Sequence, residues 1–378
     1  MKKVWIIVGI VVVAALAFVL IVTQTKKDPN EIKIGAILPL TGGAGKYGED
    51  AKGGIELSVE QKNAKGGING KPIKVIFEDD QSNPQQTVSA FRKLTSIHQL
   101  PVIIGGMTSS SALAIAPIAE HDKVVLFSPS ASAPVLSMAG DYIFRNELSD
   151  AYGGVAQAEL TWNKLGIKKV AIIFINNDYG VGVKDAFLKT FTGLGGDVPV
   201  LESFEPDAQD FRAQLTRIKQ KLPEAIFIIA YKEAILILRQ IKELGIKAKL
   251  LSTPVFEDKE IIEKAGKAAE GVIYVYYGGF EPKSMDEHIR KFVEAFRIKY
   301  NRDPGYYGAL GYDAMNIVLL AIEKAGIQSV DIKNGLYQIK DFPGVTGKTT
   351  FDSNGDVTKP VILKIVKDGK FQNYPNRV

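Results

Sequence analysis

The stretch that decides the fold runs from Val102 to Pro134 and reads VIIGGMTSSSALAIAPIAEHDKVVLFSPSASAP. It contains two short apolar runs, Val102–Ile104 and Val124–Phe127, each followed by small residues and serines. Short runs of this kind are typical of buried parallel strands. Residues Ala112–Glu120 between them have helix-forming composition. The stretch therefore predicts a strand, a serine-rich loop, a helix, a second strand and a second serine-rich loop.

The two serine-rich loops, Ser109–Ser111 and Ser128–Ser132, are candidates for a binding site. In an open α/β sheet, the loops at the carboxyl ends of the strands border the ligand crevice. Hydroxyls and free N–H groups at helix N-termini suit an anion such as a carboxylate or a phosphate. Serine also caps helices for structural reasons, which would explain one such loop. Two loops on strands expected to be neighbours favour the binding site.

Outward from this stretch, strand and helix patterns alternate in two series. The first series begins at Ile32 and ends at Arg145, and the second begins near Ser149 and runs to Val275. Such alternation predicts an α/β fold with parallel sheets and helices on both faces. Two long helical patterns follow, and the tail from Thr346 onward has strand and turn patterns that predict a hairpin and a sheet edge.

Residues 1–27 differ from the rest. Lys2 and Lys3 precede an uncharged run, Val4–Val22. A secretory signal has an apolar core of ~7–15 residues, whereas a membrane-spanning helix needs ~17–25. The length therefore favours an N-terminal membrane anchor over a cleaved signal peptide, and both place the folded part outside the cytoplasm. We expect an extracytoplasmic protein, in the periplasm or at the cell exterior, anchored by its N-terminal helix.

Composition excludes several classes of function. The net charge of +5 is spread along the chain without a basic block, which argues against nucleic-acid binding. Cysteine is absent, so there is no disulfide and no thiol nucleophile. The three histidines lie far apart and in no metal-ligand spacing. We expect no catalytic residues, no cofactor and no metal.

Two motifs resemble known binding sites but lack a residue or a spacing that those sites require. Gly43–Gly48 matches G-x-G-x-x-G, but four residues separate it from the strand, and Glu78 and Asp79 come later than the ~20 residues that a dinucleotide site requires. Asp352–Asp356 begins like a calcium loop, but Leu363 stands where the bidentate Glu belongs. We interpret the first as a polar loop that feeds a helix, with Thr41 and Tyr47 facing the serine loops, and the second as a turn.

The second series carries polar and aromatic residues at matching strand ends. Asp178–Gly180, Tyr231 and Pro254–Glu257 each follow a predicted strand. A single tyrosine in such a place is usually part of a core. Several at equivalent ends indicate a second wall of a crevice.

These residues resemble a known family. The chain from Ile32 to its end is similar to the solute-binding components of ABC importers of the leucine/isoleucine/valine-binding type, which have a type I periplasmic binding protein fold. The motifs that carry the resemblance are Leu40–Gly42 with Tyr47 and Gly48, Asn63–Gly70, Asp79 and Asp80 with Pro84, Ile104–Gly106 with Ser109, Ser128–Ser132, Phe144 and Arg145, Asp178–Gly180, Ala269–Gly271, and Phe351 and Asp352 with Gly355 and Asp356.

The resemblance implies two α/β lobes joined by three crossovers, with a small solute between them and closure by hinge motion. Carried over, 28–148 and 280–342 form lobe 1, and 149–279 and 343–378 form lobe 2. The implied partners are the solute and an ABC permease in the membrane, and we expect a monomer. The alternative function is a sensor of amides, short-chain acids or aromatic acids that acts through a separate membrane partner.

The resemblance also implies roles for individual residues. The hydroxyls of Ser109 and Ser132 would donate to a ligand carboxylate, and Ser130 would contribute its backbone. Tyr47 would line the side-chain pocket, with Tyr179 and Tyr231 over the ligand from the other lobe. Where amino-acid-binding members have an acid that pairs with the ligand ammonium, this chain has Pro254. Glu257, three positions on, is the candidate substitute.

Overall fold

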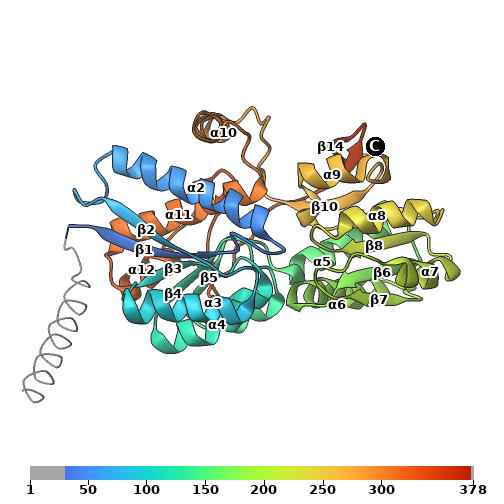
Figure 1. Ribbon diagram of the computed structural model, residues 1–378, viewed down its shortest axis with the longest axis horizontal. Coiled ribbons are helices and arrows are strands. Elements are labelled where there is room, and N and C mark those ends of the chain that lie inside the picture. Colours follow the sequence, from blue (N-terminus) through green and yellow to red (C-terminus); the bar gives the residue numbers. More distant parts are fainter. Residues whose placement is uncertain (1–29, 376–378) are drawn as a thin grey trace, which may run out of the picture.

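Two sheets, both largely parallel, organise the chain (Figure 1). The computed structural model describes residues 30–375, so the predicted anchor or signal segment, residues 1–27, lies outside the described residues. No helix within the described range is long and apolar enough to cross a membrane.

The first sheet has the strand order β2-β1-β3-β4-β5, and its strands are all parallel. Its strands are β1 Ile32–Leu38, β2 Ile73–Asp79, β3 Val102–Gly105, β4 Val125–Ser128 and β5 Ile143–Arg145. The two strands predicted to carry serine loops are β3 and β4, and they are neighbours, as expected. Short apolar strands such as β3 and β4 are buried throughout because helices cover both faces of the sheet.

The helices of the first lobe come from two distant parts of the chain. They are α2 Gly45–Ala64, α3 Pro84–Arg92, the π-helical turn Lys93–Ile97, α4 Ser109–Asp122, the 3₁₀ turn Pro134–Met138, α10 Glu287–Tyr300, α11 Tyr306–Ala325 and α12 Ser329–Tyr337. Helix α11 packs along α2, and α12 packs on α11, so the late helices complete a layer begun by the early ones. The sequence patterns did not predict α12.

The second sheet has the order β14-β13-β10-β9-β8-β6-β7. Its strands are β6 Val170–Ile175, β7 Leu201–Phe204, β8 Ala225–Ile229, β9 Lys249–Ser252, β10 Ile273–Tyr277, β13 Val361–Lys367 and β14 Lys370–Asn373. Strands β6 to β10 are parallel, and the tail adds β13 antiparallel to β10 and β14 antiparallel to β13. The expected sheet edge is therefore present.

The helices that cover the second sheet connect its strands. They are α5 Asp150–Glu159, the π-helical turn Leu160–Lys164, α6 Asp178–Gly193, α7 Arg212–Gln220, α8 Ala234–Glu243, the 3₁₀ turn Pro254–Phe256, α9 Lys259–Ala265 and the 3₁₀ turn Gly266–Ala268.

The predicted turn at Lys367–Lys370 joins β13 and β14 as a hairpin, whereas the segment around the earlier turn, Asp352–Asp356, differs from the prediction. The short strands β11 Phe342–Gly344 and β12 Gly347–Thr349 pair with each other, and the turn after Phe351 is closed only by a bridge from Phe351 to Val357. Phe351 and Val357 are buried against the core of the first lobe. Asp356 pairs with the buried Arg145 guanidinium at 2.7 Å, and this ion pair holds the turn away from the second sheet.

Three segments of chain pass between the sheets and lie side by side. A parallel bridge joins Leu148 to Val357, and the Gly278 N–H donates to the Pro360 carbonyl at 2.9 Å. Gly278 has φ +76° and an added Cβ would lie 2.2 Å from the Thr346 carbonyl oxygen, so this crossing requires glycine. The Lys359 ammonium donates to Thr346 at 2.7 Å inside this bundle.

Candidate functional site

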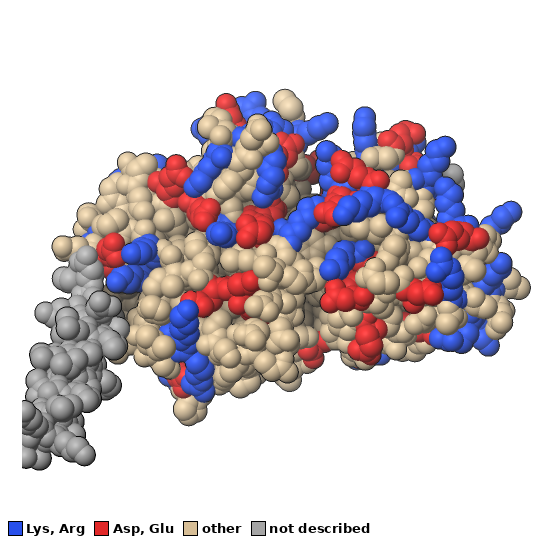
Figure 2. Space-filling view, viewed as in Figure 1, with Lys and Arg blue, Asp and Glu red and all other residues tan. Residues whose placement is uncertain are grey.

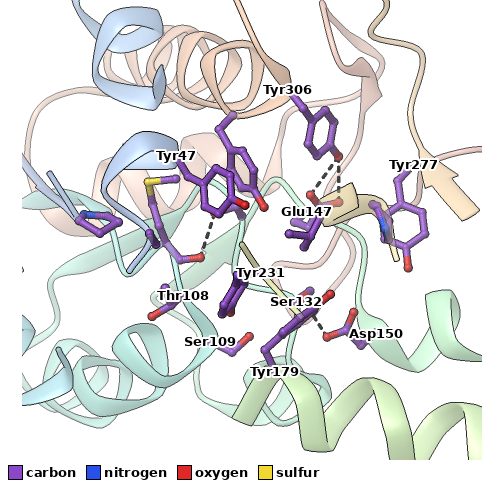
Figure 3. A pocket seen from close by; sticks show the side chains of 17 residues that line it. Tyr47, Thr108, Ser109, Ser132, Glu147, Asp150, Tyr179, Tyr231, Tyr277 and Tyr306 are labelled. Atoms are coloured by element: carbon purple, nitrogen blue, oxygen red, sulfur yellow. Dashed lines mark hydrogen bonds between the residues drawn. The ribbon is translucent and has the colours of Figure 1, made fainter. Parts of the chain in front are cut away.

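A cavity lined by residues of both lobes lies between them (Figure 3). Both sheets direct the carboxyl ends of their strands toward it, as the loops after β3, β4, β5, β8 and β9 show. Its lining residues are Pro39, Ala44, Tyr47, Met107, Thr108, Ser109, Ser130, Ser132, Glu147, Asp150, Tyr179, Tyr231, Pro254, Val255, Tyr277, Tyr306 and Tyr307.

The loop after β3 presents a helix N-terminus to the cavity. Gly106, at φ +63°, makes the turn, and an added Cβ would lie 2.8 Å from Ala112. Thr108 caps α4, because its hydroxyl accepts the Ser111 N–H at 3.2 Å. The N–H groups of Ser109 and Ser110 open the helix and have no acceptor of their own in its first turn. This is the local arrangement that binds a carboxylate.

The loop after β4 is fixed against the first by side-chain hydrogen bonds. The Ser128 hydroxyl donates to the Gly106 carbonyl at 2.7 Å, and the Ser130 hydroxyl donates to the Met107 carbonyl at 2.9 Å. The two serine loops therefore form one rigid surface, here called the serine wall.

Of the serines predicted to bind, each hydroxyl has a different partner. Ser109 accepts the Ala133 N–H at 3.2 Å, which leaves its own proton available. Ser130 and Ser132 donate within the protein, Ser132 to the Asp150 carboxylate at 2.8 Å. The serine wall can therefore offer one free hydroxyl proton and the N–H groups of its loops.

Tyrosine rings close the cavity opposite and above the serine wall. Tyr47 of α2 stacks on Tyr307 of α11 with centroids 4.5 Å apart, and Tyr179 of α6 stacks on Tyr231 at 5.1 Å. Tyr47 also approaches Tyr231 at 6.4 Å, which joins the two stacks across the lobes. The Tyr179 hydroxyl donates to Thr253 at 2.7 Å. The rings make an apolar chamber with fixed walls.

Two acids that the sequence reasoning missed also line the cavity. Glu147 and Asp150 lie on the crossover that follows β5, and both are buried. Burial raises the pKa of each carboxyl to about 7. The sequence did contain a signal for these two acids. They follow β5, the strand next to β4, and so belong to the series of loops at the carboxyl ends of the strands.

The two acids differ in how well they are satisfied. Glu147 accepts the Tyr306 hydroxyl at 2.9 Å and the Leu148 N–H at 2.9 Å, and the Lys359 charge partly offsets the rise in its pKa. Asp150 receives only the Ser132 hydroxyl, on Oδ2, and its Oδ1 accepts no hydrogen bond from the described residues. A buried carboxylate with an open oxygen is a site for a cation or a donor.

The structure places two of the predicted site residues outside the cavity. Thr41 is exposed, and its hydroxyl donates to Asp79 at 2.7 Å, so it orders its own loop. Glu257 is held by the Lys364 ammonium at 2.5 Å and by the Tyr274 hydroxyl. Strand pairing explains this, because Tyr274 of β10 lies opposite Lys364 of β13. The prediction that Glu257 faces the ligand is not supported by these contacts.

Ion pairs and a hydrogen bond join the two lobes at the rim of the cavity. Lys46 of the first lobe pairs with Asp258 and with Glu260 of the second, each at 2.8 Å. Hydrogen bonds from Lys264 and Lys46 lower the pKa of Glu260 to about 2. The Ser110 hydroxyl donates to Asp178 at 2.5 Å.

The sequence profile of the periplasmic binding protein family matches residues 31–370, nearly all of the described chain. The chain belongs to the periplasmic binding protein family. This family consists of extracytoplasmic solute-binding receptors.

Individual members of the periplasmic binding protein family are similar over almost their whole length. The leucine-, isoleucine-, valine-, threonine- and alanine-binding protein of Pseudomonas aeruginosa is 29% identical over 87% of this chain and 87% of its own. The leucine-binding protein LivK of Thermotoga maritima is 32% identical, with a TM-score of 0.85, over 91% of this chain and 98% of its own. LivJ of Streptococcus pneumoniae, solved with isoleucine, is 31% identical, with a TM-score of 0.83, over 90% and 98%.

Proposed function

We propose that this protein is the extracytoplasmic solute-binding receptor of an ABC importer and that it binds an amino acid with an apolar, branched side chain. The observation that carries the proposal is that hydrogen-bond donors and a carboxylate acceptor line the same cavity. The serine wall offers hydrogen-bond donors, and the open oxygen of Asp150 offers an acceptor beside it. An amino-acid zwitterion carries a carboxylate for the donors and an ammonium for the acceptor.

The ligand carboxylate would lie on the serine wall. The Ser109 hydroxyl can donate to it, as can the backbone N–H groups of the two loops, including those of Ser130 and Ser132. The Ser132 hydroxyl serves instead to orient Asp150. Donors fixed in this way need little reorganisation when the ligand arrives.

The ligand ammonium would lie against Asp150, with Glu147 close behind in the same cavity wall. At the position where amino-acid-binding members have the acid that pairs with this ammonium, the chain has Pro254. An unpaired buried ammonium would be costly, and so would the ionised Asp150 carboxylate in an empty cavity. Each charge therefore offsets the desolvation of the other.

The side chain would fill the space between the tyrosine rings. Tyr47, Tyr179 and Tyr231 present ring faces rather than charges, and Val255 adds an apolar surface. The relatives named above bind leucine, isoleucine, valine and other small amino acids. This supports a branched-chain ligand without selecting one.

Closure of two lobes around the ligand would convert binding into a signal for the permease.

We propose lobe boundaries near 148/149 and 279/280. The packing of Phe351 and Val357 on the first lobe supports a last crossover after Val357 rather than at 342/343. We also propose that residues 1–27 anchor the protein, that it is a monomer and that it catalyses no reaction. The apolar run Val4–Val22 supports the anchor, and it has no bearing on the monomeric state or on catalysis.

Ligands that lack one of the two charged groups test where the carboxylate and the ammonium bind. Isothermal titration of residues 28–378 would compare leucine with 4-methylpentanoate, which lacks the ammonium, and with 3-methylbutylamine, which lacks the carboxylate. We expect leucine to bind and both analogues to lose at least a hundredfold in affinity. If 4-methylpentanoate or benzoate bound more tightly than any amino acid, the alternative of an acid or amide receptor would replace this proposal.

A further inference from the structure

The end of the second lobe that lies opposite the cavity carries a cluster of unpaired lysines. Strands β8, β9 and β10 begin at this end, and α7 and α8 end there. We call this surface the basic pole, and its exposed lysines are Lys221, Lys242, Lys247, Lys249, Lys267 and Lys370. Figure 1 shows α7 and the end of α8 at the right-hand end, where lysine and arginine side chains protrude in Figure 2.

Short contacts hold the turns of the basic pole together. The Lys249 N–H donates to the Glu224 carbonyl at 2.9 Å, and the Lys219 ammonium donates to the Leu244 carbonyl at 2.7 Å. The Gly271 N–H donates to the Val366 carbonyl at 2.9 Å, which places the β13–β14 turn beside the start of β10. The lysines therefore share one surface.

The acids at this end of the described chain, Glu224, Glu243, Glu270 and Asp368, form no ion pair with the six lysines of the basic pole. Glu243 pairs with Arg212 of α7. Glu224 accepts the Lys168 N–H, and Glu270 accepts the N–H groups of the β13–β14 turn. Within residues 30–375, none of the six lysines forms an ion pair.

The corresponding end of the first lobe carries both paired and unpaired cations. There Lys62 pairs with Glu323 and Arg92 pairs with Asp122, each at 2.8 Å, while Lys123 pairs with Glu120 at 2.6 Å. Helix C-termini favour basic residues at both ends of the molecule. The exposed lysines Lys65, Lys71, Lys74 and Lys324 at that end form no ion pair within the described residues, so they provide a matched control for the basic pole.

An exposed leucine lies within the basic pole. Leu222 is 80% exposed, follows Lys221 and has φ +49°, a left-handed conformation that a leucine rarely adopts. An apolar side chain that projects among lysines matches the chemistry of a membrane surface, where lysines meet phosphates and the apolar group enters between the headgroups.

We propose that the basic pole binds the anionic lipid headgroups of the membrane outside which the protein works, a proposal that rests on the extracytoplasmic location of the family. The described chain begins at Asn30, at the far end of the first lobe (Figure 1). With the proposed anchor of residues 1–27 at the other end, contact at the basic pole would hold the long axis along the membrane surface. This keeps both lobes near the plane in which a permease lies.

Vesicle co-sedimentation tests this surface. Residues 28–378 are suited to it because every strand and helix of both sheets lies within 30–375. We expect binding to vesicles of phosphatidylcholine with phosphatidylglycerol, weaker binding as salt rises, and little binding to phosphatidylcholine alone. Equal binding to both lipids, or binding to neither, would overturn the proposal, as would capture by a soluble acidic polypeptide in preference to vesicles.

Matched variants locate the contact. Lys221, Lys242, Lys247 and Lys249 changed together to Gln should lower the partition coefficient at least tenfold, whereas the control with Lys65, Lys71, Lys74 and Lys324 changed to Gln should bind as the parent does. Leu222→Asn, which suits a left-handed backbone, should lower binding a few-fold at high salt. An equal loss in the control would refute the basic pole. Leucine titration of each variant reports separately on the cavity, so failure of one proposal is distinguishable from failure of the other.

Discussion

The serine wall and Asp150 of the crossover are neighbours in one cavity, but their hydrogen-bonding groups are satisfied to very different degrees. In the serine wall, the hydroxyls of Ser128 and Ser130 donate to backbone carbonyls of the neighbouring loop. On the crossover, Asp150 has a single donor and an open oxygen. The first region is complete before a ligand arrives, and the second is not. Affinity for any acid should therefore come from the wall, and selection of an amino acid from the crossover.

Removing the donors of the wall should have the largest effect on affinity. Ser109→Ala with Ser132→Ala removes one hydroxyl that points at the carboxylate and one that orients Asp150. Hydrogen bonds to charged groups are worth about 1.5–3 kcal/mol each, so we expect roughly 3–6 kcal/mol less binding free energy for leucine by titration. An unchanged affinity in a protein with a normal melting temperature would refute the serine wall as the carboxylate site.

Neutralising the crossover acid should come next. Asp150→Asn keeps the shape but removes the charge that faces the ligand ammonium, and truncation of a buried ion pair costs roughly 2–5 kcal/mol. The variant should lose affinity for leucine but keep whatever weak affinity the parent has for 4-methylpentanoate, which has no ammonium. If both ligands weakened equally, the acid and the wall would not have separate tasks.

Lowering the pH should reproduce, in the parent protein, the loss of leucine affinity expected for Asp150→Asn. The pKa of Asp150 is raised to about 7 by burial, so below that pH the carboxyl is protonated in the empty cavity. Leucine affinity should fall by up to tenfold for each pH unit below about 7 and level off above it. Asp150→Asn should show a flatter profile, and a parent profile that is flat from pH 5 to 8 would contradict the assignment.

The empty protein should show the opposite trend in stability. The folded pKa values of Glu147 and Asp150 lie above those of exposed carboxyls, so between about pH 4 and 7 the folded state binds more protons than the unfolded chain. Stability without ligand should therefore fall as pH rises through this range. Thermal melts from pH 5 to 8 measure it, and Asp150→Asn should melt higher than the parent at pH 8.

The smallest effect on affinity is expected at the two residues outside the cavity. Glu257→Gln should leave leucine affinity within about twofold, but should lower stability by roughly 3 kcal/mol because Lys364 is buried and Glu281 lies farther away, at 3.4 Å. Thr41→Ala should change affinity no more than Glu257→Gln does. A large loss of binding in either variant would return that residue to the site.

Much of the fold could be predicted from the sequence because its signals are local. Buried parallel strands such as β3 and β4 are short apolar runs, and turns and helix starts after them contain glycine and serine. The position of the serine wall followed from the same pattern. The tail was harder, because burial of Phe351 and the Arg145–Asp356 pair depend on segments about two hundred positions apart.

The acids of the site show what local patterns do not contain. Asp150 reads as an ordinary first residue of a helix, and only the approach of the Ser132 loop buries it in a cavity. Glu257 seemed suitable because it stands near Pro254 in sequence. Its partner Lys364 reaches it only through the pairing of β13 with β10, which no local pattern indicates.

The bridge from Lys46 to Asp258 and Glu260 has a kinetic consequence. It joins residues of opposite lobes, so it exists only after the lobes have met and takes no part in the first encounter with a solute. Salt that weakens this exposed pair should shorten the dwell time of a captured molecule and leave the capture rate nearly unchanged. If so, the ionic strength around the protein would change how long a loaded receptor stays closed around its solute.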